Sequence, residues 1–150
     1  LTSNAAYTDS GGNNSYTDLL GMRGLAGYLS LPTTASINGI EITVVVFNIA
    51  RAGSGNITGY FDLVKATDNR VGTQKTQSFP PGSGGSYTIG GSNDLWGVSW
   101  TAAEIRDAGF GVDVGYFFNQ FYSVSLEQVY ATIYYTDTGG GGSSRVFLIT

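Results

Sequence analysis

The segment 94–114 constrains the fold more than any other part of this sequence, because it holds both tryptophans, a helix-start signal and a strand alternation. Trp96, Val98 and Trp100 stand at alternate positions. In an extended segment, alternate side chains lie on one face of the strand. The first part of the segment therefore predicts a strand that buries two indole rings together.

A short helical turn is predicted next, over residues 102–108. Thr101 stands where an N-cap residue is favoured, and Glu104 follows at the spacing of a capping box. Gly109 is expected to end the turn, because glycine readily adopts the left-handed conformation that closes a helix. The turn connects the tryptophan segment to the strand that follows.

Alternation of apolar residues resumes directly after the turn. The apolar positions are Phe110, Val112, Val114, Tyr116 and Phe118. This period of two predicts a half-buried strand, with Asp113 on its solvated side. The predicted core anchors of the whole chain are Trp96, Trp100, Phe110 and Val112.

Further strand patterns flank this nucleus on both sides. Residues 37–48 form the strongest, a β-branched run that is apolar at both parities, as expected for a central strand covered on two faces. Residues 124–136 alternate as well, but Leu126 has the wrong parity unless a β-bulge lies near Glu127 and Gln128. Turn signals separate about seven or eight such segments, which predicts an all-β, antiparallel β-sandwich of jelly-roll type. A barrel is the alternative.

The composition fits one domain of this class. The chain has 150 residues with 10 Tyr and 8 Phe, but only 12% charged residues and a net charge of −4. A chain of this length can bury a core without disulfides. Its seven basic residues are scattered and no apolar run is long enough to span a bilayer, so neither nucleic-acid binding nor membrane insertion is expected.

The ends of the chain are predicted to lie outside the sandwich. We assign an N-terminal arm to residues 1–21, the sandwich domain to 22–136, a Gly/Ser linker to 137–144 and a terminal strand to 145–150. An apolar strand left in water is an aggregation hazard, so the last segment should pair. It could fold back onto its own sheet, lead into a further domain, or be exchanged with a neighbouring subunit. The residues assigned to assembly are Val146, Phe147, Leu148 and Ile149.

Several short segments match one recurring sequence pattern. They are residues 37–41 (Ile-Asn-Gly-Ile-Glu), 63–65 (Leu-Val-Lys), 94–97 (Asp-Leu-Trp-Gly) with Trp100, Thr101 and Ile105, 110–112 (Phe-Gly-Val) and 131–136 (Ala-Thr-Ile-Tyr-Tyr-Thr). Over residues 22–136 the chain resembles a β-sandwich module of phage virion proteins and bacterial cell-surface proteins. It departs from that module at Ala102, where Pro is usual, and at Glu127, where Asp is usual. The resemblance implies a non-enzymatic structural or adhesive role on an external surface, with no catalytic residues to carry over.

The residue types present exclude most catalytic designs. The chain has no His and no Cys, which removes Ser-His-Asp triads, thiol nucleophiles and the usual zinc sites. A carboxylate pair of glycosidase type stays open on paper, and the acids available for it are Asp62, Asp94, Asp107, Asp113 and Glu127. The sequence contains no EF-hand motif for calcium, although acidic residues that could bind calcium occur in predicted loops at Asp9, Asp68 and Asp137. We expect no enzymatic activity, no metal site and no cofactor.

An outer face of the sandwich is predicted to carry aromatic residues. Tyr130, Thr132 and Tyr134 occupy the parity opposite the core positions of their strand. Neighbouring tyrosine rings are suited to stacking on sugar rings or to a subunit interface. The alternative is that a strand or the N-terminal arm covers them. Asn13 and Asn56 begin N-glycosylation triplets, which matter only in a source that glycosylates.

These patterns favour a non-enzymatic structural subunit of an extracellular or virion assembly, such as a capsid decoration, cement or fibre protein. Its expected partners are copies of itself or neighbouring structural subunits, joined through the terminal segments. One alternative is an extracellular filament or pilus subunit that assembles by strand donation. Another is a module that binds surface glycans through the outward tyrosines.

Overall fold

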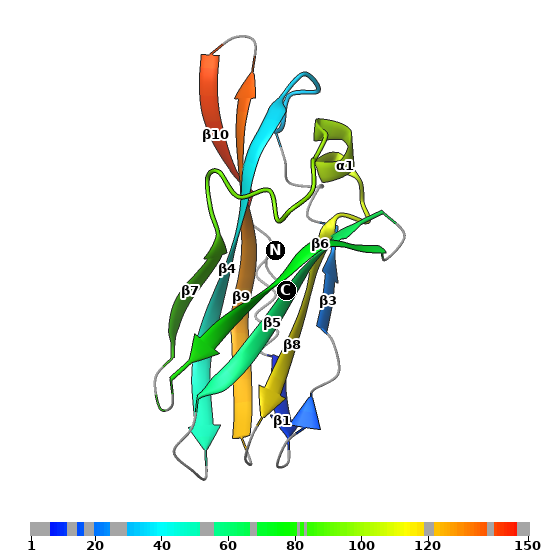
Figure 1. The fold of residues 1–150 in the computed structure, drawn as a ribbon. Coiled ribbons are helices and arrows are strands. Elements are labelled where there is room, and N and C mark those ends of the chain that lie inside the picture. The colour runs from blue at the N-terminus through cyan, green and yellow to red at the C-terminus, as the bar shows by residue number, and fades with distance from the viewer. Residues whose placement is uncertain are drawn as a thin grey trace.

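The structure, a computed structural model, describes residues 7–11, 15–16, 20–24, 30–51, 56–66, 69–80, 82, 84–118, 122–137 and 140–146. Within them, ten strands and one short helix build two antiparallel five-stranded sheets, layered as a sandwich (Figure 1). This confirms the predicted all-β sandwich, while jelly-roll connectivity stays a prediction. The number of strands exceeds the predicted seven or eight, and two of the additional strands, at residues 7–11 and 15–16, lie within the segment predicted to be an arm.

The first sheet has the order β1-β9-β4-β7, and β10 also pairs with β9. Its strands are β1 (Tyr7–Gly11), β4 (Ser36–Arg51), β7 (Gly85–Gly90), β9 (Tyr122–Asp137) and β10 (Gly140–Val146). β4 and β9 have 16 residues each and pair along their length, so they form the centre of this sheet. Ile42 and Val44 of β4 are fully buried and Thr43 between them is 3% exposed, in agreement with a strand covered on both faces.

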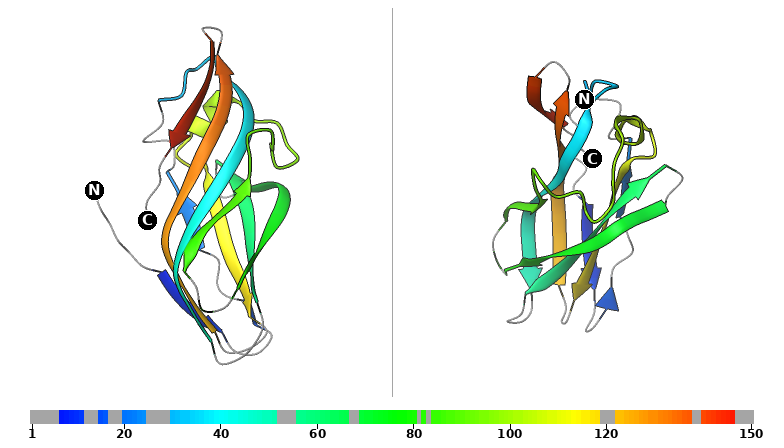
Figure 2. Two further views of the ribbon diagram at one scale, coloured as in Figure 1. Left: turned by 90° about the vertical axis from the view of Figure 1, so that its left-hand side faces the viewer. Right: turned by 45° about the horizontal axis from the view of Figure 1, so that its top comes forward.

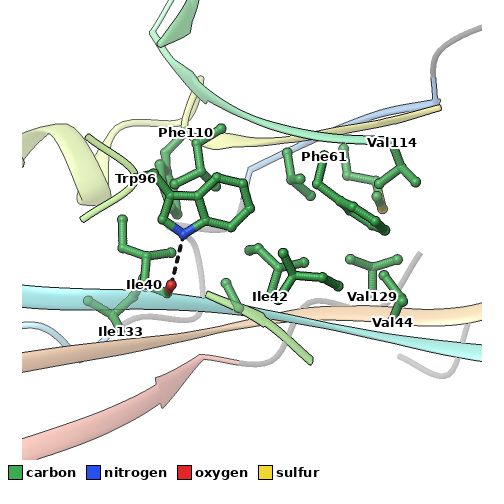
Figure 3. Packing of buried hydrophobic residues seen from close by; sticks show 14 of the residues in the cluster. Ile40, Ile42, Val44, Phe61, Trp96, Phe110, Val114, Val129 and Ile133 are labelled. Atoms are coloured by element: carbon green, nitrogen blue, oxygen red, sulfur yellow. Dashed lines mark hydrogen bonds between the residues drawn. The ribbon is translucent and has the colours of Figure 1, made fainter. Parts of the chain in front are cut away.

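The second sheet has the order β2-β8-β5-β6, and β3 pairs with β8. Its strands are β2 (Ser15–Tyr16), β3 (Leu20–Arg23), β5 (Ile57–Lys65), β6 (Asn69–Phe79) and β8 (Gly111–Phe118). The β8 alternation places Val112, Val114 and Tyr116 in the core. The core lies between the two sheets, where the inward side chains of β4 and β9 meet those of β5 and β8 (Figure 3).

A β-bulge in β9 reconciles its two hydrophobic parities, as predicted. The register with β4 passes from Val45 opposite Gln128 to Val46 opposite Leu126, so Glu127 is the extra residue. Leu126 and Val129 are therefore both buried although their positions differ in parity. The hydrophobic pattern revealed the bulge because a one-residue slip would otherwise expose half of these side chains.

The predicted helical turn is confirmed as α1 (Ala102–Arg106). The Thr101 N–H donates to Glu104 Oε2 at 2.8 Å, and the Glu104 N–H donates to Thr101 Oγ1 at 3.2 Å, which completes the capping box. The helix ends at Arg106 with Asp107 as its C-cap, two residues before the expected Gly109. The Asp107 carboxylate accepts the Gly109 N–H at 2.7 Å. This side-chain hydrogen bond stabilises the turn after the helix, which was expected to depend on Gly109.

The strand predicted over the tryptophans is wrong, because residues 91–100 form turns rather than a strand. Trp96 has a left-handed φ of 58°, which breaks the extended geometry that the alternation required. The Asp94 carboxylate stabilises this turn by accepting the Trp96 N–H at 2.9 Å. Both rings nevertheless face the core, with exposures of 0% for Trp96 and 6% for Trp100.

Trp96 connects the two sheets. Its indole N–H donates to the carbonyl of Ile40 in β4 at 2.9 Å (Figure 3). Its own carbonyl accepts the N–H of Thr73 in β6 at 2.8 Å. The segment therefore satisfies its backbone groups with partners in both sheets, which a strand in a single ladder could not do.

Parts of the predicted arm and of the predicted linker belong to the sheets. Within the predicted arm 1–21, β1 pairs with β9 and β2 pairs with β8. Within the predicted linker 137–144, residues 140–144 belong to β10 and pair with β9. Glycine and serine composition suggested a flexible linker, but backbone pairing does not depend on side-chain type when a strand edge lies alongside.

Replacing Gly72 by alanine is expected to destabilise the protein by about 4 kcal/mol or more, the range of exceptional effects. Gly72 has a φ of 78°, and a methyl group on it would collide with the Trp96 carbonyl oxygen. The matched control is Gly24→Ala, with a φ of 80° and open space around the added methyl group, where a loss of about 1–2 kcal/mol is expected. Urea unfolding of both variants measures the difference, and equal losses would contradict the role given to the Trp96 carbonyl.

Candidate assembly edge on strand β9

Strand β9 has different neighbours on its two edges. β4 pairs with one edge along almost the whole strand. On the other edge, β1 pairs with residues 122–126 and β10 pairs with residues 131–137. Because both are antiparallel to β9, β1 and β10 run in the same direction and follow one another along one edge (Figure 2, left).

Between β1 and β10 lie Glu127, Gln128, Val129 and Tyr130, which we call the β9 window. Among the residues that the structure describes, no strand pairs with Glu127, Gln128 or Val129 on this edge. The edge of a sheet is a template on which another strand can pair. The bulge at Glu127 lies in the window, and such bulges often mark where regular pairing stops.

The window presents one face to the core and one to the outside. Val129 is 1% exposed and lies in line with Ala131 and Ile133 of the core. Gln128 and Tyr130 are half-buried on the outer face. A strand that docked here would therefore place alternate side chains beside the core and on the outer surface.

The predicted aromatic face lies beside the window. Tyr130, Thr132 and Tyr134 point outward from β9, opposite Thr43, Glu41 and Gly39 of β4. The Tyr134 hydroxyl donates to Glu41 Oε2 at 3.1 Å. Thr132 is only 4% exposed and both tyrosines are half-buried, so this face is more covered than a fully outward surface would be.

The residues assigned to assembly reach the edge of the described chain. Val146 is the last residue of β10 and stands opposite Ala131. Phe147, Leu148 and Ile149 lie outside the described residues. The terminal strand thus begins earlier than predicted and pairs with its own β9 through Val146.

The predicted core anchors other than the tryptophans also lie inside the sandwich. Phe110 and Val112 are fully buried, and the Phe110 ring meets the Trp100 ring edge-on with centroids 5.5 Å apart. Edge-to-face contact at this separation is favourable for aromatic pairs. These side chains support the scaffold and are remote from solvent.

Asp113 is not solvated, contrary to the sequence prediction. It is 5% exposed and lies between two guanidinium groups, with Arg23 Nη1 2.8 Å from Oδ1 and Arg70 Nε 2.7 Å from Oδ2. Asp62 stands directly opposite Asp113 on β5 and accepts a hydrogen bond from Gln74 at 2.8 Å. Both arginines pair with Asp113, which offsets the repulsion expected between carboxylates at facing positions. This arrangement is an ion-pair network across the outer face of the second sheet.

Two further acids bind lysines that cover the tryptophan rings. Lys75 Nζ lies 2.8 Å from Asp94 Oδ2 and 5.3 Å from the Trp96 ring centre. Burial acts to raise the pKa of Asp94, but hydrogen bonds from Lys75 and the Trp96 N–H outweigh it and leave this pKa below its ordinary value. Asp94 is thus held as a carboxylate that fixes the turn.

Glu104, in helix α1, likewise pairs with a lysine that lies over a tryptophan ring. Lys65 Nζ lies 2.7 Å from Glu104 Oε1 and 4.8 Å from the Trp100 ring centre. The hydrogen bond from Lys65, followed by that from the Thr101 N–H, holds the pKa of Glu104 below its ordinary value. Sequence reasoning missed both lysines, because neither is near its acid in the chain.

The other sequence candidates fall at separate places. Asp137 accepts a hydrogen bond from Thr34 at 2.8 Å, and the exposed Asn56 donates from Nδ2 to Ser78 Oγ at 2.8 Å. Asn13 and Asp68 lie outside the described residues, as does the side chain of Asp9. The described residues contain no group of three His, Cys, Asp or Glu side chains placed to hold a metal ion.

Comparisons with other proteins and with membrane-spanning patterns gave no assignment. No family model, no curated protein and no solved structure matches this chain. No helix in the described part of the chain is long and apolar enough to cross a membrane. The functional argument therefore starts from the β9 edge and the residues around it.

The free energy of unfolding is expected to fall as the pH drops below about 4.5, the ordinary range of carboxyl groups. A carboxylate whose pKa is lowered in the folded state contributes stability above its unfolded pKa, and this contribution is lost as the pH falls through the folded pKa. Asp94 and Glu104 both belong to this class. Urea unfolding between about pH 3 and pH 6 measures the slope, and the double variant Asp94→Asn with Glu104→Gln should flatten it. An unchanged slope in that variant would contradict the assignment.

Proposed function

We propose that this protein is a non-enzymatic structural subunit of an extracellular or virion assembly, joined to neighbouring copies through its terminal segments at the β9 edge. One observation carries the proposal: the first and last described strands, β1 and β10, share one edge of the long central strand β9, so both terminal regions of the described chain come to the same sheet edge. An edge of this kind is suited to the addition of a strand, which brings main-chain hydrogen bonds and side-chain packing in one step.

A contact in which one copy donates a terminal segment and the next accepts it uses two different surfaces. Such heterologous contacts close into rings or continue into filaments and shells. Capsid decoration, cement and fibre proteins fall within this group, and so does a filament or pilus subunit. The resemblance of residues 22–136 to a module of virion and cell-surface proteins favours the same group.

The internal architecture supports a role in holding shape. Trp96 hydrogen-bonds to both sheets, and the Asp113 network spans β3, β8 and β6 through Arg23 and Arg70. The Trp96 indole and the Asp113 carboxylate are buried and hydrogen-bonded, and buried polar groups with satisfied partners favour one arrangement of the fold. A rigid scaffold suits a subunit that has to fix the positions of its neighbours.

Glycan binding is the second candidate, favoured by the placement of Tyr130 and Tyr134 on one outer face with the Glu41 carboxylate at the Tyr134 hydroxyl. Aromatic rings with a neighbouring polar group can stack on a sugar and bind its hydroxyls. Replacing Tyr134, which lies outside the window, by alanine would weaken sugar binding on this reading and leave assembly through the β9 edge unchanged. The two functions are therefore separable by mutation.

The assembly proposal is tested with the purified chain, by size-exclusion chromatography with light scattering and by negative-stain imaging over a range of concentrations. The full chain is expected to form rings, filaments or larger particles. A variant without residues 1–6 and 147–150 keeps every described strand and is expected to be a monomer with the same β signal in circular dichroism. The variant Tyr134→Ala, outside the window, is the control, and it should assemble like the full chain. A full chain that stays monomeric, or a truncated chain that assembles equally well, would contradict the proposal.

A further inference from the structure

Strand β6 is the longest outermost strand among those that the structure describes, and none of the described strands pairs with it on the side away from β5. It has 11 residues, whereas β1, β2, β3, β7 and β10, the other outermost strands, have 7 or fewer. A long exposed strand edge is a site where two copies of a protein can pair. We propose that Lys75 and the turn around Trp96 close this edge, and so prevent β6 of one copy from pairing with β6 of another.

The Trp96 turn covers the part of β6 around Thr73. The Thr73 N–H donates to the Trp96 carbonyl at 2.8 Å, so this backbone donor is already used. The contact is close on both sides, because a methyl group on Gly72 would collide with the Trp96 carbonyl oxygen and one on Gly97 would collide with Thr73 Oγ1. A strand from a neighbouring copy cannot occupy the place that this turn fills.

Lys75 closes the middle of β6. It stands opposite Phe61, whose side chain is fully buried, and directly opposite residues point to the same face, so Lys75 lies on the core side of this outermost strand. Its ammonium is 2.8 Å from Asp94 Oδ2 and 5.3 Å from the centre of the Trp96 ring, while 26% of the side chain is exposed. A docked strand would cover that exposed part of a charged side chain without offering it a new partner, which is unfavourable.

The rest of the strand offers a partner little apolar surface. Thr76 and Ser78 are exposed, and the half-buried Gln77 donates from Nε2 to the Ser78 carbonyl at 2.9 Å. Phe79, the last residue of β6, is fully buried and its ring meets the Tyr87 ring edge-on at 4.7 Å. Apolar pairs across two strands stabilise a sheet, and the exposed residues after Lys75 do not supply them. A β-branched apolar residue at position 75 would supply one, so this position is where the proposal is tested.

One consequence of the closed edge rests on the proposed function. A β6–β6 contact would use the same surface in both copies and would end at a dimer, whereas a contact between donor and acceptor surfaces at β9 can continue from copy to copy. Closing β6 therefore removes a mode of association that would compete with assembly at the β9 edge.

The test compares two lysines that make the same kinds of contact at different places in the sheet. Lys65, like Lys75, pairs with a carboxylate and lies over a tryptophan ring. Lys65 belongs to β5, however, which has β6 on one side and β8 on the other. Lys75→Val and Lys65→Val each remove one ion pair and one cation–π contact, but only Lys75→Val acts on an outermost strand.

A single cysteine reports which surfaces meet, because the chain contains none of its own. Ser78→Cys marks an exposed position on β6, and Ala103→Cys marks an exposed position on α1 as the control. Each is combined with Lys75→Val, with Lys65→Val and with neither. The full-chain proteins are treated at equal concentration with a short bifunctional thiol cross-linker, and denaturing gels measure the fraction of covalent dimer.

With Ser78→Cys as the reporter, Lys75→Val is expected to raise the covalent dimer about five-fold, and Lys65→Val is expected to leave it unchanged. With Ala103→Cys as the reporter, neither substitution should raise it. No rise with Lys75→Val, an equal rise with Lys65→Val, or an equal rise through Ala103→Cys would overturn the proposal. If circular dichroism shows that Lys75→Val does not fold, Lys75→Thr, which also removes the charge and has a β-branched side chain, is judged by the same outcomes.

Failure of the closed edge and failure of the proposed function give different results. The cross-linking yields are compared between variants, so they judge the β6 edge whether or not the unsubstituted chain assembles. If the unsubstituted chain stays monomeric, assembly at β9 is contradicted, and a rise with Lys75→Val through Ser78→Cys still supports the closed β6 edge. If the unsubstituted chain assembles and Lys75→Val gives no rise, the proposed function stands and Lys75 does not close β6.

Discussion

The position of Trp96 is the constraint on which the sandwich depends. Its indole N–H bonds to Ile40 in one sheet and its carbonyl accepts the Thr73 N–H of the other, so a single residue fixes the sheets relative to each other. The left-handed backbone that makes this possible is unfavourable for a tryptophan, and the Asp94 carboxylate offsets part of that cost by accepting the Trp96 N–H. Gly72 supports the same contact, because any side chain there would meet the Trp96 carbonyl.

Asp94 and Glu104 each accept a backbone hydrogen bond and also pair with a lysine. Glu104 caps α1 and holds Lys65 above the Trp100 ring, while Asp94 stabilises the Trp96 turn and holds Lys75 above the Trp96 ring. A lysine over an indole face is attracted to its π electrons and its alkyl chain shields the ring from water. Local capping and burial of the tryptophans are therefore coupled through the same carboxylates.

The edge of β9 differs from the region around Trp96, where hydrogen bonds join the two sheets. Strand pairing along β9 is complete on the β4 side, but the other edge is shared by the first and last described strands, with the window between them. A strand edge binds whichever segment supplies backbone groups in register, so it is the place where one fold can either close on itself or join a neighbour. We therefore place the proposed assembly at this edge and regard the tryptophan end as its rigid support.

The sequence by itself determined the features that arise from local hydrogen bonding and from side-chain period. These are the capping box of Thr101 and Glu104, the alternation of β8, and the bulge at Glu127, which follows from the parity of the core residues of β9. Only the tertiary structure decided which distant segments meet. Asp113 is buried where Arg23 and Arg70 reach it from other strands, and β1 and β10, which are far apart in the chain, pair with the same strand β9. Strand partners are set by contacts between residues far apart in the chain, and the pattern within one segment does not contain that information.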